Sequence, residues 1–255
     1  MNCPTWPQRL RLFFLMIPLV LAPAVQAAEC KLDATGTGVV ASVRDGRTLL
    51  LADGREVRLA AIEVTETSRE ALRTLAAGQK VRLARLGREE HDRYGRLVAF
   101  VFAEEAPQSL QQTLLEAGQA RVSARIGDKA CMSALLAVEH DARTARRGQW
   151  ADPNFAPLSS ENWRGLEAAR GRFALVEGKV LSVREAGATI YVNFGRRWTR
   201  DFTVTIPKRQ RATFAAGGVD LNRLQGRFIR VRGVVERRGG HLIDVAHSGQ
   251  IELVE

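Results

Sequence analysis

The sequence lacks the motifs of several common enzyme classes. Its four histidines show no metal-ligand spacing, and neither a Ser/His/Asp arrangement nor a glycine-rich phosphate-binding loop is evident. No low-complexity or coiled-coil segment interrupts the 255 residues. This length suggests two ordinary domains once a targeting segment is removed.

The sequence also lacks a membrane-spanning run at its N-terminus. The apolar run Leu12–Val25 has about 14 residues, short of the roughly 20 that a spanning helix needs. Arg9 and Arg11 precede it, and small residues follow it up to Ala27. This pattern is typical of a cleaved secretory signal at residues 1–27, so we expect a periplasmic or secreted protein without a transmembrane span. The alternative is a membrane anchor.

Cysteine is scarce. Of the three cysteines, Cys3 would leave with the signal, so that Cys30 and Cys131 remain. An even pair in an exported protein indicates a disulfide formed in an oxidising compartment. This bond would tie the start of the mature chain to a helix that begins near Met132. The alternative is two free thiols.

Acidic residues are scarce in the last third of the chain. The full chain carries a net charge of +10. Residues 28–165 hold 20 lysines and arginines against 19 acidic residues, whereas residues 166–255 hold 16 against 9. Basicity gathered on one domain suggests a polyanionic partner, either nucleic acid or an acidic envelope surface.

Three short segments in the first half of the chain carry the chemistry. They read VRDGRTL at 43–49, VRLAAIEVTE at 57–66 and DRYGR at 92–96. Their order and spacing resemble the staphylococcal-nuclease-like (thermonuclease) family, in which equivalent segments converge on one phosphodiester. The resemblance covers roughly residues 36–152 and includes the stretches AGQARV at 117–122 and RGQW at 147–150. It implies a five-stranded OB-type barrel with packed helices.

The residue pattern agrees with that fold, which is mainly β with packed helices. Apolar alternation broken by turn residues predicts strands, and apolar residues at helical spacing predict helices. We expect three strands within 36–59, further strands at 80–85 and 97–102, and helices from Thr67 or Ser68 to Gly78, from Ser109 to Gly118 and from about Met132 to Arg147.

A second domain is expected at residues 170–255, after a linker at 153–169 that is rich in turn formers. Five strands with a helix between the third and fourth predict a second OB-like β-barrel, and the alternative is a small sandwich. The expected strands lie at 173–183, 189–194, 201–206, 228–235 and 241–245, with a helix near 208–215 and a last run at 251–254.

The resemblance assigns catalytic roles to three residues. Hydrolysis of a phosphodiester needs an activated water and positive charge near the phosphoryl oxygens. Glu66 stands in the position of the base or water-orienting carboxylate. Arg58 and Arg96 stand in the positions of phosphate ligands, since a guanidinium can grip two oxygens at once. The alternative is a surface ion-pair cluster.

The family's calcium site is altered. The positions of its two aspartates hold Arg47 and Glu63, and the position of its carbonyl ligand holds Val64. Asp45 could supply a carboxylate from two residues earlier. Because Arg47 brings a positive charge where a hard cation should bind, we expect weak or absent calcium dependence. Either the guanidinium replaces the cation, or catalysis is lost and binding is kept.

Further residues are candidates for contact with nucleic acid. Arg93 and Tyr94 belong to the DRYGR loop, where Tyr94 could instead be a packed loop residue. Arg230 and Arg232 alternate with apolar residues and would point outward together. A loop between two C-terminal strands adds Arg196, Arg197, Trp198 and Arg200, whereas Phe194, Phe202 and Phe228 are expected in the core.

Two functions are compatible with this sequence. One is a phosphodiesterase that acts on DNA or RNA with altered or lost calcium dependence. The other is a non-catalytic binder of nucleic acid or of an envelope partner, derived from the nuclease fold.

Overall fold

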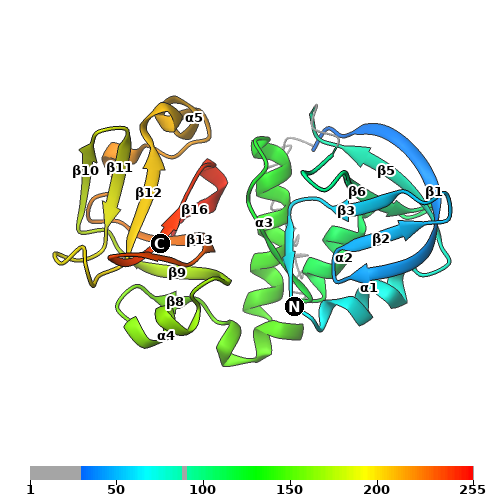
Figure 1. Ribbon diagram of the computed structural model, residues 1–255, viewed down its shortest axis with the longest axis horizontal. Helices are drawn as coiled ribbons and strands as arrows, with labels where there is room; N and C mark the ends of the chain where they lie inside the picture. The colour runs from blue at the N-terminus through cyan, green and yellow to red at the C-terminus, as the bar shows by residue number, and fades with distance from the viewer. Residues whose placement is uncertain (1–29, 88–90, 255) are drawn as a thin grey trace, which may run out of the picture.

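The structure is a computed structural model that describes residues 30–87 and 91–254. The expected signal at residues 1–27 lies outside the described residues. Figure 1 shows a barrel formed by the N-terminal part of the chain and a set of sheets formed by the C-terminal part. The long helix α3 (Lys129–Thr144) lies between them.

The N-terminal strands form the closed five-stranded barrel that the sequence predicts, in the order β1-β2-β3-β6-β5. The first strand is 13 residues long and pairs with β5 through its first half and with β2 through its second half. A parallel pairing of β3 with β6 completes the barrel. The strands are β1 (Asp33–Asp45), β2 (Thr48–Leu51), β3 (Glu56–Leu59), β5 (Lys80–Arg85) and β6 (Leu97–Ala103).

Three helices pack on this barrel. Both α1 (Ser68–Ala76) and α2 (Leu110–Glu116) lie where they are predicted. The N-terminus of α2 is fixed by a capping box between Ser109 and Gln112. The helix α3 begins before the predicted start near Met132 because the carboxylate of Asp128 accepts the N–H of Cys131 and caps an earlier turn.

Two connections in this domain depend on contacts distant in sequence. The Cys30–Cys131 disulfide is present, as predicted, and ties the N-terminal end of the described chain to the first turn of α3. The short strands β4 (Ile62–Val64) and β7 (Ala120–Val122) pair antiparallel, although each is too short to show a strand pattern in the sequence.

The predicted second barrel is wrong. The C-terminal strands form two open sheets, in the orders β10-β11-β12-β15-β14 and β16-β13-β9-β8, and no ladder joins the sheets among the described residues. Their inner faces share one apolar core, which favours the sandwich alternative. The strands are β9 (Phe173–Lys179), β10 (Ser182–Ala186), β11 (Thr189–Asn193), β12 (Thr203–Pro207), β13 (Phe228–Val234), β14 (Glu236–Arg238), β15 (Gly240–Asp244) and β16 (Ile251–Leu253).

Two segments of the chain cross from one sheet to the other. A single strand is predicted at 173–183, but β9 ends at Lys179. The chain then continues as β10, which belongs to the other sheet. The chain changes sheets again between β13 and β14, at the buried residue Val235. Between β12 and β13 lies α5 (Arg211–Ala216), close to the predicted helix.

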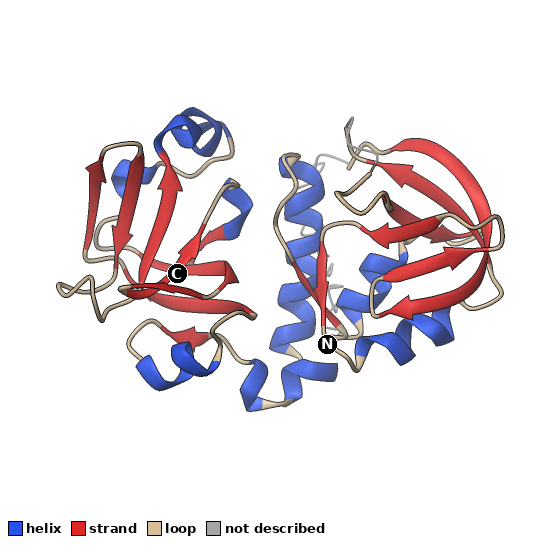
Figure 2. Cartoon of the chain, viewed as in Figure 1, coloured by secondary structure: helices blue, strands red, loops and turns tan. Residues whose placement is uncertain are grey.

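The segment expected to be a linker contains ordered structure (Figure 2). Within residues 153–169, β8 (Leu158–Ser159) pairs in parallel with β9, and α4 (Trp163–Ala168) places Leu166 in the C-terminal core. Much of this segment therefore packs with the C-terminal sheets. No helix within 30–87 or 91–254 is long and apolar enough to cross a bilayer.

Candidate active site

Strand pairing brings the three motif segments to one end of the barrel. Arg58 in β3 is paired with Thr48, just after the β1–β2 turn. On its other side Arg58 is paired with Val98 in β6, which begins immediately after Arg96. Residues about 40 positions apart in the sequence therefore become neighbours through the parallel pairing of β3 with β6.

The β1–β2 turn packs against the segment that follows β4. Asp45 Oδ1 accepts the N–H of Arg47 at 2.8 Å, which fixes the turn. A Cβ on Gly46 would lie 3.0 Å from Val64 Cγ2 and 3.1 Å from the carbonyl oxygen of Thr65. Glycine therefore permits close approach of the turn to the segment that leads into Glu66.

Arg47 binds the carboxylate that the resemblance assigns to calcium. Its Nη1 donates to Glu63 Oε2 at 2.6 Å and to the carbonyl of Ile62 at 3.2 Å. Val64 is held in register with Ala120 in the β4–β7 pair. Within the described ranges, no group of three or more His, Cys, Asp or Glu side chains could hold a metal ion. The arginine that engages Glu63 makes this donor set a poor fit to calcium.

Arg96 is held within its own loop. Its Nε and Nη2 donate to Asp92 Oδ2 at 2.9 and 2.6 Å, and Asp92 Oδ1 accepts the N–H groups of Tyr94 and Arg96. Burial raises the pKa of Asp92, but these hydrogen bonds outweigh it and hold the pKa below its ordinary value. The loop therefore presents the Arg96 guanidinium in a fixed position.

The Arg58 guanidinium has free donors. It is half-buried, and its side chain makes no hydrogen bond or ion pair with any other residue that the structure describes. Burial lowers its pKa, and the positive charges of Arg47 and Arg96 lower it further. A half-buried cation with unsatisfied donors and cationic neighbours is suited to an external anion such as a phosphate.

Glu66 lies in the turn between β4 and α1 and is exposed. In the described part of the chain, its carboxylate forms no hydrogen bond or ion pair. The turn is positioned by Gln149, whose Nε2 donates to Thr65 Oγ1 at 2.8 Å and to the carbonyl of Gln119 at 3.0 Å. Gln149 belongs to the RGQW stretch, which supports the family resemblance. The sequence does not predict that Gln149 positions the turn that carries Glu66.

Tyr94 is exposed and is not a packed loop residue. Its side chain is 67% exposed, and the guanidiniums of Arg93 and Arg96 lie 4.9 and 5.1 Å from its ring centroid. These cation–π contacts gather two cations and an aromatic ring on the surface beside Arg58.

The C-terminal candidates divide into two groups. Arg196, Arg197, Trp198 and Arg200 lie in an exposed loop after β11. The expectation that Arg232 points to solvent is wrong, because it is fully buried. Phe228, expected in the core, is 44% exposed.

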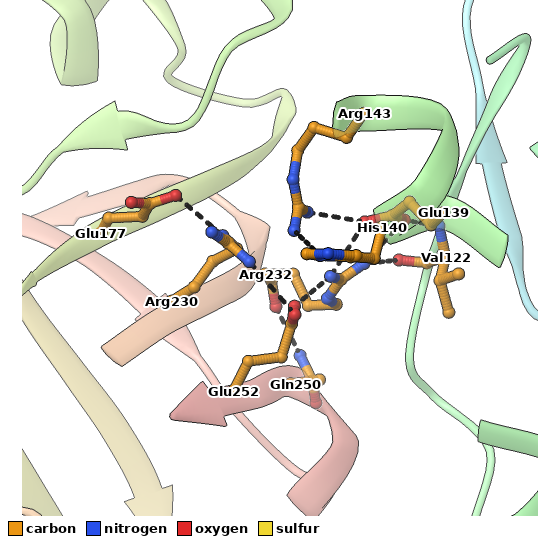
Figure 3. A network of polar contacts seen from close by, with 9 residues as sticks. All are labelled: Val122, Glu139, His140, Arg143, Glu177, Arg230, Arg232, Gln250 and Glu252. Atoms are coloured by element: carbon orange, nitrogen blue, oxygen red, sulfur yellow. Dashed lines mark hydrogen bonds and ion pairs between the residues drawn. The ribbon is translucent and has the colours of Figure 1, made fainter. Parts of the chain in front are cut away.

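Arg232 is buried because α3 covers its face of β13 (Figure 3). It donates to both carboxylate oxygens of Glu139 at 2.9 and 3.0 Å, to the carbonyl of Val122 at 2.9 Å and to Glu252. Burial opposes the positive charge, but Glu139 and Glu252 outweigh it and raise the pKa of Arg232. Arg230, on the same face, donates to Glu177 at 2.8 Å.

Comparison with known proteins agrees with this geometry for the N-terminal domain. Residues 54–152 match the family described as SNase: Staphylococcal nuclease homologue. They therefore form an SNase family domain, which includes Arg58, Glu66 and Arg96. The match begins after β1, β2 and the turn that carries Arg47. No family identifies the C-terminal domain, and no curated protein matches the chain.

Proposed function

We propose that the SNase family domain binds a phosphodiester of DNA or RNA at the end of its barrel and hydrolyses it without calcium. The observation that carries this proposal is Arg58, half-buried between Arg47 and Arg96 with its donors free. Family membership of the domain supports a nuclease-related function.

In this proposal the two guanidiniums grip the phosphate. Arg58 donates to a non-bridging oxygen, and Arg96 donates with the part of its guanidinium that Asp92 leaves free. As an external water attacks phosphorus, negative charge grows on these oxygens and both cations stabilise it. Glu66 accepts the proton of that water, and its exposed carboxylate is open to a water molecule. The P–O ester bond opposite the attacking water breaks, and the leaving oxygen takes a proton from solvent.

Arg47 has a supporting role in the same proposal. Its ion pair with Glu63 links the β1–β2 turn to β4, which are the two segments that a shared cation would otherwise connect. Both members of the pair act on Arg58, whose pKa is lowered by the charge of Arg47 and raised by that of Glu63. No step of the reaction uses a metal ion.

A second candidate function is binding without cleavage. It is favoured by the same Arg47–Glu63 pair, because a metal ion stabilises transition-state charge by several kcal/mol and a tethered guanidinium replaces only part of this.

We also propose that the protein works outside the cytoplasm, in the periplasm or as a secreted protein. The Cys30–Cys131 disulfide supports this location because such bonds persist in oxidising compartments. Intact mass of the exported protein, with and without alkylation, tests both the removal of residues 1–27 and the protection of the two thiols.

The decisive experiment compares cleavage and binding in one set of variants. Labelled single-stranded DNA and RNA are incubated with the wild type and with Glu66→Gln, in calcium and in chelator. We expect cleavage that survives the chelator and is lost in Glu66→Gln, while binding remains. Glu70→Gln, which changes an exposed glutamate in the next helix, is the matched control.

Two outcomes would redirect the proposal. Binding without cleavage in every condition would assign the second function. Cleavage that Glu66→Gln leaves unchanged would exclude this site as its source.

A further inference from the structure

The C-terminal domain has a large groove that is separate from the active site. It lies over the outer face of the five-stranded sheet and has a volume of 1360 Å³. In Figure 1 this sheet lies on the opposite side of α3 from the barrel. The groove is therefore not part of the site that holds Arg58.

Strand register decides which side chains face the groove. Ile190, Val204 and Ile243 are fully buried in the core, so their neighbours in each strand point to the other face. Direct pairing aligns one row of these outward residues across the sheet. The row consists of Arg184, Tyr191, Thr205 and Asp244.

The next row is also polar. It aligns Ser182 with Asn193 and Asn193 with Thr203. Hydroxyl and amide groups on an open sheet face can donate to and accept from a ligand that lies across the strands. The groove floor therefore carries polar groups among apolar ones such as Leu242, which continues this row beside Thr203, and Tyr191 adds an aromatic ring.

The loop between β11 and β12 forms one wall and is held in shape. Asp201 Oδ2 accepts the N–H of Arg197 at 2.8 Å, and Phe194 donates through its N–H to the carbonyl of Phe202 at 3.1 Å. Because Asp201 binds the backbone rather than a guanidinium, the arginines of this loop remain available.

Trp198 projects from this loop as an ordered, exposed ring. It is 69% exposed, yet a Cβ on Gly239 would lie 2.9 Å from its Cζ3. The indole therefore packs against the β14–β15 turn, where glycine makes room for it, and most of its surface faces solvent. An exposed ring held in this way suits stacking with a flat ligand group.

The charge of the groove favours an anion. Arg184 and Arg196 line it, are exposed, and make no ion pair with another described residue. By contrast, the groove's carboxylates are already paired, Glu185 with Lys208 and Asp244 with Arg238. The free charge in the groove is therefore positive, in agreement with the excess of 16 basic over 9 acidic residues in 166–255.

We propose that this groove is a second nucleic-acid site, which binds single-stranded DNA or RNA independently of the active site. The exposed ring of Trp198 and the half-buried ring of Tyr191 stack on bases, while Arg184 and Arg196 contact phosphates. Free guanidiniums beside aromatic rings on an open sheet match the chemistry of single strands, whose charge and base faces are both accessible.

The test measures binding to the groove alone. The full chain carries Arg58→Ala and Glu66→Gln to disable the active site, and gel analysis confirms that the probe stays intact. The probe is a fluorescent oligothymidylate of about 15 nucleotides, long enough for one site of this kind. We expect binding to persist in this background and to quench tryptophan fluorescence.

Two substitutions then separate stacking from charge. Trp198→Ala should weaken binding at least about fivefold, the loss expected for one stacked base. Arg184→Ala with Arg196→Ala should lower the slope of log affinity against log salt by about 2. Phe228→Ala and Arg223→Ala, which change exposed residues that do not line the groove, should leave both quantities unchanged.

Three results would overturn the proposal. Loss of all binding in the Arg58→Ala, Glu66→Gln background would place the strand at the active site alone. Full affinity in Trp198→Ala and in the double arginine variant would exclude the groove. Equal binding of a sulfated polysaccharide, insensitive to Trp198→Ala, would make the groove a site for polyanions without base stacking. None of these results depends on whether the active site cleaves.

Discussion

Two clusters in this molecule are both built from arginine side chains, but the arginines of each cluster make different contacts. At the barrel end, Arg47 and Arg96 each bind a carboxylate while Arg58 binds none among the described residues. At the domain interface, Arg143, Arg230 and Arg232 all bind carboxylates, with Glu139 and Glu252 shared between them.

The difference shows how the same side chain becomes structural or available. Arg232 is fully buried and its two terminal nitrogens bind acceptors from both parts of the chain, so it fixes how α3 meets β13. Arg58 is half-buried with free donors. An arginine whose acceptors lie within the protein holds the fold, whereas one that lacks them can bind an external anion.

The largest expected effect is on the interface cluster. Arg232→Ala should lower the free energy of unfolding by about 3–5 kcal/mol, because the buried carboxylate of Glu139 loses the guanidinium that binds both of its oxygens. The matched control Arg237→Ala, which breaks the exposed pair with Glu167, should cost less than about 1 kcal/mol. Urea unfolding measures both. Equal losses would remove the distinction between the buried and exposed pairs.

The next effect concerns the free arginine. Arg58→Ala should weaken oligonucleotide binding by about 10- to 100-fold, the loss of a charge-assisted hydrogen bond, with little change in unfolding free energy. Binding is measured by fluorescence polarisation in a background that carries Trp198→Ala, Arg184→Ala and Arg196→Ala, so that the second site loses both stacking and charge and does not mask the change. The control is Arg44→Ala, an exposed arginine paired with Glu56. A large stability loss in Arg58→Ala would instead make this residue structural.

A smaller effect is expected for calcium. Arg47→Asp should create a site of about millimolar affinity, the weakest class of protein calcium site, by restoring a carboxylate beside Glu63. Titration calorimetry measures this directly, and Arg47→Met, which removes the cation without adding a ligand, should bind no calcium. Tight calcium binding by the unmodified protein, abolished by Glu63→Ala, would show that Arg47 does not block the site.

The smallest effect is on the acid dependence of stability. Burial raises the pKa of Glu252, but Arg232 and Arg230 outweigh it and hold the pKa below its ordinary value of about 4.3. Its contribution is therefore complete above that value and is lost as pH falls through the lowered pKa. In unfolding experiments, Glu252→Gln should reduce the loss of unfolding free energy at low pH, whereas the exposed control Glu116→Gln should not. An unchanged pH dependence of the unfolding free energy would show that ionised Glu252 does not stabilise the interface.

The sequence by itself determined the local elements and the family of the first domain. Alternating apolar residues set the barrel strands, and Ser109 with Gln112 set the start of α2, because these signals act within a few residues. The motif segments identified Arg58, Glu66 and Arg96 as candidates, and strand pairing then brought Arg58 and Arg96 to one end of the barrel.

Tertiary structure alone decided what covers each face. Alternation correctly put Arg230 and Arg232 on one face of β13, but it carries no information about α3, whose Glu139 lies 93 positions from Arg232. The same limit applies to the C-terminal sheets, because closure into a barrel depends on pairing between distant edges. It also applies to Arg47, because contact between the β1–β2 turn and β4 brings Glu63 to it. A local pattern determines which way a side chain points, and only long-range packing determines what it meets.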